Sequence, residues 1–241
     1  MPTSASRRHI SMAPAVDDDW LTDAELLASF QDNSGGVWSM ALDFETGRLY
    51  VDCGFFSKHS RFIEGFLQNL DVGSLAVEPR NFPIMVNVPR LFCPLTVAIE
   101  DVRDALAVLY YPDRFPIEPD KIGRIAEVAD FFDIPLLMHK ADQALLEQLR
   151  QRIVRHNGVP MRFMWFGETE WSQLMEALLL ADRFKLKKSW SRMKQGILTS
   201  LDDVGQLIDQ PDFRKLSASA QLDVLEGCVR KHMTYVKHNW K

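Results

Sequence analysis

The segment WSMALDFETGRLYVDC, residues 38–53, has the alternation of two β-strands joined by a turn at 45–48. The alternating apolar residues are Trp38, Met40, Leu42 and Phe44 before the turn and Leu49, Val51 and Cys53 after it. We expect an antiparallel hairpin with one buried face. A third strand is predicted further along, at 83–88 (PIMVNV).

Around this hairpin the periodicity becomes helical. A short helix is predicted at about 58–69, and from residue 96 onward apolar residues recur at i, i+3, i+4 and i+7. Further helices are expected at about 96–111, 122–134, 135–154, 171–179, 190–201 and 217–236, the last with Leu222, Leu225 and Val229 on one face. A small sheet with many amphipathic helices predicts an α+β fold.

One short helix is predicted before the hairpin. Thr22 or Asp23 can cap it, and Leu26, Leu27 and Phe30 lie on one side. This helix has too little apolar surface to be stable alone, so it must dock on its own chain or on a second copy. The sequence leaves both possibilities open.

Composition sets limits on the function. The 241 residues have a formal net charge of −5, which argues against general nucleic-acid binding. The widely separated Cys53, Cys93 and Cys228 indicate reduced thiols. Residues 1–19 are expected to be disordered, and the sequence shows neither a signal peptide nor a membrane span. We therefore expect a cytoplasmic or nuclear protein.

A weak internal repeat links the two halves of the helical region. The segment ADFFDI at 129–134 recurs as ADRFKL at 181–186, each time between two predicted helices. This indicates that one helix-turn-helix unit is used twice.

Four segments together resemble the BTB/POZ family: GRLYV at 47–51, FSKHSRFIEGFL at 56–67, AVLYY at 107–111 and AEVADFFDIP at 126–135. The resemblance covers about residues 37–150, and residues 179–230 are similar to the BACK-like helical tail of MATH-BTB proteins. Together with the composition, these resemblances imply a disordered tail at 1–19, a BTB/POZ-like domain with an N-terminal helix at 20–155, and a C-terminal helical region at 156–241. No MATH, kelch or zinc-finger module fits the remaining sequence.

The BTB/POZ resemblance implies a homodimer that acts as an adaptor, linking a substrate protein to the cullin of a ubiquitin ligase. It places the dimer interface at Leu26, Leu27, Phe30 and Phe62. It places the cullin-facing surface at Phe66, Leu67, Leu70, Val77, Glu78, Tyr110 and Tyr111. The family's hydrophobic-x-Glu triplet has its nearest match at 76–78 (AVE), where the first residue is small. The alternative is a self-associating scaffold or transcription-related oligomer that binds no cullin.

Several residues could in principle be catalytic or bind a metal, but each is better explained by a structural role. Cys53 with His59 would suggest a hydrolase, but no Gly-x-Ser-x-Gly elbow accompanies them. Cys228 and His232 could form half of a metal site, but no further ligands are evident. The basic run from Arg183 to Lys194 could suggest phosphate contact or docking of an acidic partner, but it is interpreted as a solvated helix face. We expect a non-enzymatic protein with no cofactor, no metal, and no nucleic-acid or membrane partner.

Overall fold

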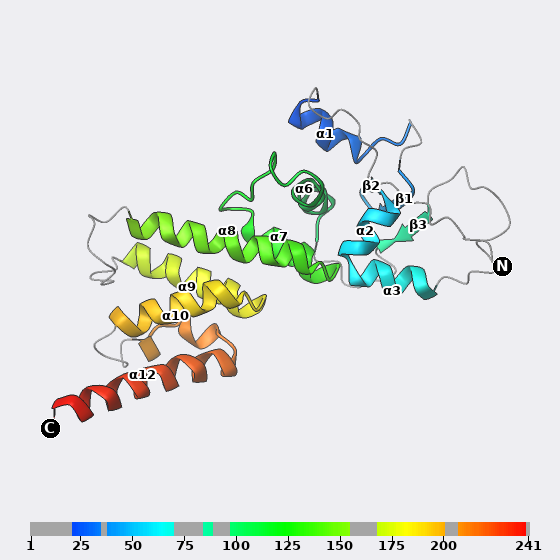
Figure 1. The fold of residues 1–241 in the computed structure, drawn as a ribbon. Helices are drawn as coiled ribbons and strands as arrows, with labels where there is room; N and C mark the ends of the chain where they lie inside the picture. Colours follow the sequence, from blue (N-terminus) through cyan, green and yellow to red (C-terminus); the bar gives the residue numbers. More distant parts are fainter. Residues whose placement is uncertain are drawn as a thin grey trace, which may run out of the picture. The chain divides into compact units, whose positions relative to one another are not determined.

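The computed structural model describes residues 21–34, 38–69, 84–88, 97–154, 168–200 and 207–239, without the side chains of 151–154, 168–171, 199–200 and 235–239. Its contacts divide the chain into two units (Figure 1). The first unit comprises residues up to Pro116 together with Phe131–Pro135, and the second comprises Ile117–Asp130 and the chain from Leu136 on. A small sheet and many helices confirm the α+β class.

The first unit contains the predicted hairpin. Strands β1 (Met40–Phe44) and β2 (Gly47–Val51) are antiparallel, with Phe44 opposite Gly47 and Met40 opposite Val51. Strand β3 (Ile84–Asn87) lies parallel to β1 on its other side, so the order is β2-β1-β3. The expectation of one buried face was incomplete. Ala41 is fully buried, as are Met40 and Leu42, because the central strand is covered on both faces at this point.

Two helices follow the hairpin where the sequence predicted one. Helices α2 (Cys53–His59) and α3 (Arg61–Asn69) are separated by Ser60, whose backbone is extended (φ −107°, ψ 110°). The Ser60 hydroxyl accepts a hydrogen bond from the Ile63 amide (3.1 Å) and donates one to the Phe132 carbonyl (2.6 Å). Because Ser60 caps α3 and is fully buried, the break between the helices is fixed in the core of the first unit.

Two more helices complete the first unit. Helix α1 (Asp23–Ser29) is capped by Thr22, one of the two predicted candidates, which forms a capping box with Glu25. Helix α6 (Ile99–Tyr110) buries the predicted stripe of Val102, Ala105, Leu106 and Leu109. It contacts both α1 and β2.

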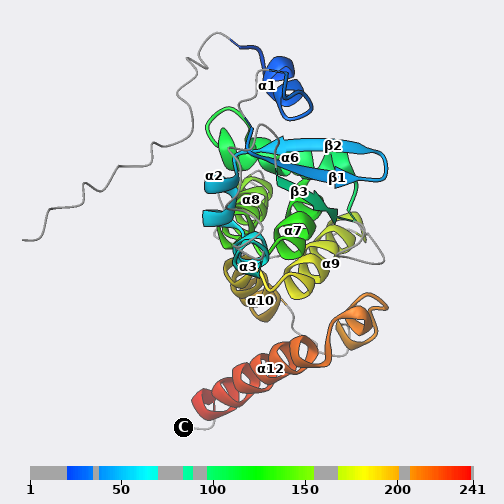
Figure 2. The same ribbon diagram turned by 90° about the vertical axis from the view of Figure 1, so that its right-hand side faces the viewer.

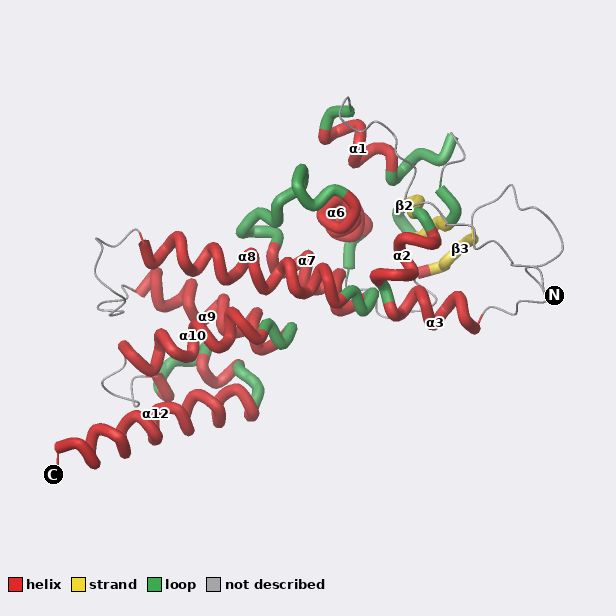
Figure 3. Tube along the Cα trace, viewed as in Figure 1, coloured by secondary structure: helices red, strands yellow, loops and turns green. Residues whose placement is uncertain are grey.

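The second unit is helical. It contains α7 (Ile122–Phe131), α8 (Pro135–Val154), α9 (Glu168–Arg183), α10 (Lys187–Ser200), the short 3-10 helix η2 (Phe213–Lys215) and α12 (Ala218–Asn239). Helices α8, α9, α10 and α12 form successive layers (Figures 1 and 3), and α10 contacts both α9 and α12. The expected boundary at residue 155 places α7 and α8 in the first domain. By their contacts, most of α7 and α8 instead belong to the same unit as the helices that follow.

Helix α12 packs through a face other than the one that the sequence suggested. Leu222 and Val229 are 58% and 57% exposed and Leu225 is half-buried, whereas Ala220, Val224 and Cys228 are buried. The reason is close helix packing: a Cβ on Gly227 would lie 2.8 Å from Leu198 Cδ1 of α10. Small side chains permit this approach, so the more strongly apolar face is left outside.

The two copies of the internal repeat share one backbone feature. Asp133 and Lys185, the fifth residues of their repeats, have φ values of 45° and 54°. At the second corner the Leu186 amide bonds to the Ala181 carbonyl (2.9 Å) and the Lys185 amide to the Asp182 carbonyl (3.4 Å). These bonds form a Schellman motif with lysine where glycine is usual. The similarity of the repeats therefore extends to the turn geometry.

None of the described helices combines the length and apolar character needed to cross a membrane. Figure 2 shows the same elements from the side.

Candidate functional site

The described part of the first unit contains an aromatic cluster, defined as Phe30, Trp38, Phe55, Tyr110 and Tyr111. The ring of Tyr110 lies 5.5 Å from Phe30, 5.9 Å from Trp38 and 4.2 Å from Phe55, measured between centroids. These residues come from the end of α1, the segment before β1, α2 and the end of α6. The cluster therefore joins elements that are far apart in sequence.

The Tyr110 hydroxyl fixes the start of α2. It accepts a hydrogen bond from the Asp52 amide (3.1 Å) and faces the Asp52 carbonyl at 3.4 Å. Burial raises the pKa of the Tyr110 phenol well above its ordinary value, so the hydroxyl keeps its proton. The Asp52 carboxylate caps α2 by accepting from the Phe55 amide (2.6 Å). These contacts give Tyr110 a structural role.

The residues predicted for the dimer interface have different environments. Leu26 and Phe30 are buried within their own chain, whereas Leu27 and Phe62 are half-buried. Helix α1 is held by a bond from Trp38 Nε1 to the Ser29 carbonyl (2.9 Å) and by an ion pair between Arg114 and Asp23 (2.8 Å). The helix thus docks on its own chain, one of the two possibilities that the sequence left open.

The predicted cullin-facing residues are also divided. Phe66 and Leu67 are half-buried neighbours on α3. Tyr110 and Tyr111 belong to the aromatic cluster. Leu70, Val77 and Glu78 lie outside the described residues. Phe66 and Leu67 therefore leave apolar surface accessible on α3.

Comparison with known proteins assigns no family to this geometry. No protein-family model matches the sequence, and a search of curated proteins found no match. The contacts themselves therefore carry the functional argument.

Cys53 and His59, the pair behind the hydrolase alternative, lie at opposite ends of α2. Burial, followed by the charge of Asp52, raises the pKa of the Cys53 thiol. Burial, followed by the charge of Lys58, lowers the pKa of His59, whose ring lies 4.6 Å from that of Phe55. A raised thiol pKa reduces the thiolate fraction at neutral pH, so these environments do not favour a nucleophile.

We expect iodoacetamide to alkylate Cys53 more slowly than a free cysteine peptide at pH 8, because the raised pKa leaves less thiolate. Mass spectrometry of digested protein resolves Cys53 from Cys93 and Cys228. The same protein unfolded in urea serves as the control, and its Cys53 should be alkylated at the rate of the free cysteine peptide. Alkylation of native Cys53 faster than the free peptide at pH 7 would contradict this prediction and revive the hydrolase alternative.

Cys228 and His232, the possible half of a metal site, have unlike environments on α12. Cys228 is buried, which raises its thiol pKa, whereas His232 is exposed. Within the described ranges, no three His, Cys, Asp or Glu side chains gather as metal ligands.

The structure divides the basic run into two groups. The first group is paired: Arg183 with Glu127 (2.8 Å), Lys185 with Asp182 (2.9 Å), and Lys194 with Asp223. The Lys194 ammonium and the Trp190 indole N–H hold the pKa of Asp223 below its ordinary value. The second group, Lys187, Lys188 and Arg192, lines a groove that the interpretation as a solvated face did not foresee. Within this group, the Arg192 guanidinium bonds to the Gln195 side chain (3.4 Å).

Proposed function

We propose that the protein is a non-enzymatic interaction adaptor that self-associates through a BTB/POZ-like region and presents a surface for a cullin. The proposal is carried by the order of the elements. The β1–β2 hairpin is followed by α2 and α3, then by β3 beside β1, and then by α6, α7 and α8. The BTB/POZ resemblance implies two strands, a helix, a strand and three helices, which matches this order except that two helices stand where one is expected.

Accessible apolar side chains support the interaction role. Phe66 and Leu67 on α3 are half-buried, and so are Leu27 and Phe62 of the expected dimer interface. Apolar and aromatic residues of this kind supply much of the binding energy at protein interfaces. Dimerisation would set the spacing of two bound partners and raise their effective concentration.

Self-association is tested on the full chain by light scattering. We expect a dimer, and we expect Leu27→Asp to shift it toward monomer, because a charge is then buried at the interface. The matched control is Gln31→Asp, which adds the same charge at an exposed position just after α1. A monomer at every concentration, or equal effects of the two variants, would argue against this interface.

Cullin binding is tested by capture of the full chain with a cullin N-terminal domain. We expect capture, and we expect Phe66→Asp to weaken it by about tenfold, because it replaces an aromatic contact with a charge. Gln68→Asp, at an exposed position on the same helix, should leave capture unchanged. A dimer that captures no cullin would overturn the ligase role and support the alternative scaffold.

A further inference from the structure

Helix α10 is strongly basic. Its sequence, KKSWSRMKQGILTS, contains Lys187, Lys188, Arg192 and Lys194 but no carboxylate. Lys194 is neutralised by Asp223 of α12. Lys187, Lys188 and Arg192 line a groove with residues of α8.

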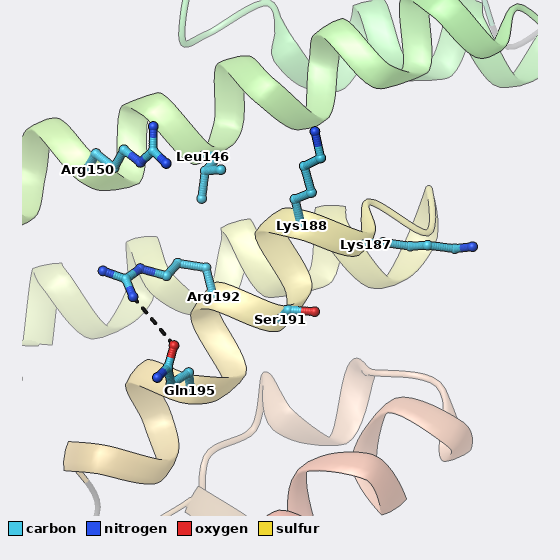
Figure 4. Close-up of a pocket in the computed structure, with 7 residues that line it drawn as sticks. All are labelled: Leu146, Arg150, Lys187, Lys188, Ser191, Arg192 and Gln195. Atoms are coloured by element: carbon cyan, nitrogen blue, oxygen red, sulfur yellow. Dashed lines mark hydrogen bonds between the residues drawn. The ribbon is translucent and has the colours of Figure 1, made fainter.

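The groove has a volume of about 640 Å³ and is open to solvent (Figure 4). Its walls comprise Leu146 and Arg150 of α8 and Lys187, Lys188, Arg192 and Gln195 of α10. Figure 4 shows Lys188 reaching toward α8, while Lys187 and Arg192 point in opposite directions along α10. The positive charges are thus spread along the groove and do not converge on one point.

The two lysines of the groove, Lys187 and Lys188, lack a carboxylate partner in the part of the chain that the structure describes, and both are exposed. Arg192 bonds to the neutral Gln195 (3.4 Å). Arg150 pairs with Glu147 at 3.7 Å, and both side chains are more than half exposed (62% and 56%), so this ion pair is weak.

The second carboxylate near the groove, Asp142 of α8, is already engaged. It accepts hydrogen bonds from the amides of Lys188 (3.0 Å) and Ser189 (2.9 Å) and from the Ser189 hydroxyl (2.6 Å). These bonds join α8 to the first turn of α10 and fix the two walls of the groove. They also occupy the amides that a phosphate would use at a helix N-terminus.

We propose that this groove binds a short acidic segment of a partner protein. Carboxylates spaced along an extended peptide match the separated charges of Lys187, Lys188 and Arg192. The half-buried Leu146 gives an apolar side chain of the same peptide a place to pack. This binding is independent of the proposed function, since its residues all belong to the second unit.

Two other anionic classes fit less well. A single phosphate is bound best by converging donors or free helix amides, and here the charges diverge while Asp142 holds the amides. A nucleic acid is disfavoured by the net charge of −5 and by the absence of an aromatic side chain from the groove walls.

The test measures fluorescence anisotropy of a labelled glutamate peptide with a central leucine, added to the full chain at low salt. We expect saturable binding that weakens with added salt. The double variant Lys188→Gln with Arg192→Gln should bind about tenfold more weakly, because two charge-assisted contacts are lost. Both glutamines keep much of the aliphatic stem, and a thermal melt followed by circular dichroism checks that the variant is folded.

The matched control is Lys185→Gln with Lys215→Gln, which makes the same change in net charge at exposed lysines outside the groove. This variant should bind like the unmodified protein. Equal weakening by the two double variants would overturn the proposal, since binding would then reflect only the overall charge. Stronger binding of a single-stranded oligonucleotide, or displacement of the peptide by inorganic phosphate well beyond that caused by chloride at the same ionic strength, would overturn it in favour of that ligand class.

Discussion

Replacing Phe30 with alanine is expected to lower the free energy of unfolding of the first unit by about 3–5 kcal/mol, the usual cost of removing a buried aromatic ring. Phe30 is fully buried, and its ring contacts Trp38 (5.6 Å), Tyr110 (5.5 Å) and Tyr111 (6.3 Å), measured between centroids. Its removal leaves a cavity where α1 meets the end of α6. The Phe30 carbonyl also accepts the Tyr50 amide of β2 (2.7 Å), so the loss should spread to the edge of the sheet.

Urea unfolding gives the change in stability, and hydrogen exchange at the Tyr50 amide shows whether the contact between α1 and β2 loosens. Leu27→Ala is the control, because Leu27 lies on the same helix but is only half-buried, and it should cost about 1 kcal/mol or less. If Phe30→Ala proved as mild as the control while abolishing a dimer, then Phe30 would act between chains, and the docking of α1 described above would be wrong.

Replacing Asp142 with alanine is expected to destabilise the second unit by about 2–4 kcal/mol. The carboxylate is buried (6% exposed) and accepts hydrogen bonds from two amides and one hydroxyl of α10. Without it, the amides of Lys188 and Ser189 lose their acceptor, and Ser189 is itself fully buried. A buried donor without an acceptor costs about 1–3 kcal/mol, so the loss at the two amides explains the size of the effect. The Ser189 hydroxyl keeps an acceptor in the variant, the Asp142 backbone carbonyl (2.9 Å).

Hydrogen exchange of the Lys188 and Ser189 amides reports this change directly, alongside urea unfolding. Asp142→Asn keeps one carbonyl acceptor and should lose less stability than Asp142→Ala. Gln143→Ala, at the next and exposed position of α8, should change neither exchange nor stability. Unchanged protection of the two amides in Asp142→Ala would show that α10 does not depend on this contact.

Local patterns predicted the elements that local forces determine. The hairpin follows from strict alternation around a turn, and a cap at Thr22 or Asp23 follows from a capping residue just before an apolar helical stripe. The buried stripe of α6 follows from helical spacing. In each case the interacting residues are close in sequence, so their spacing was sufficient to reveal the structure.

Features that depend on distant residues were missed. Asp142 bonds to Ser189, 47 residues away, and nothing near Asp142 marks it as a cap for another helix. The groove required Arg150 and Leu146 to meet a basic helix from later in the chain. The packing face of α12 was wrong because hydrophobicity favoured Leu222 and Val229, whereas close approach to α10 favoured the small residues beside Gly227.

The corner at Lys185 has a consequence for how this chain tolerates changes in length. The left-handed backbone of Lys185 ends α9 and fixes the direction in which the chain leaves this helix. Helix α10 then begins at Lys187, directly after Leu186. A single residue inserted near the end of α9 would rotate the exit direction of the chain by about 100°, since a helix turns once in 3.6 residues. Natural variation in length should therefore avoid the ends of α9 and α10 that meet at this corner.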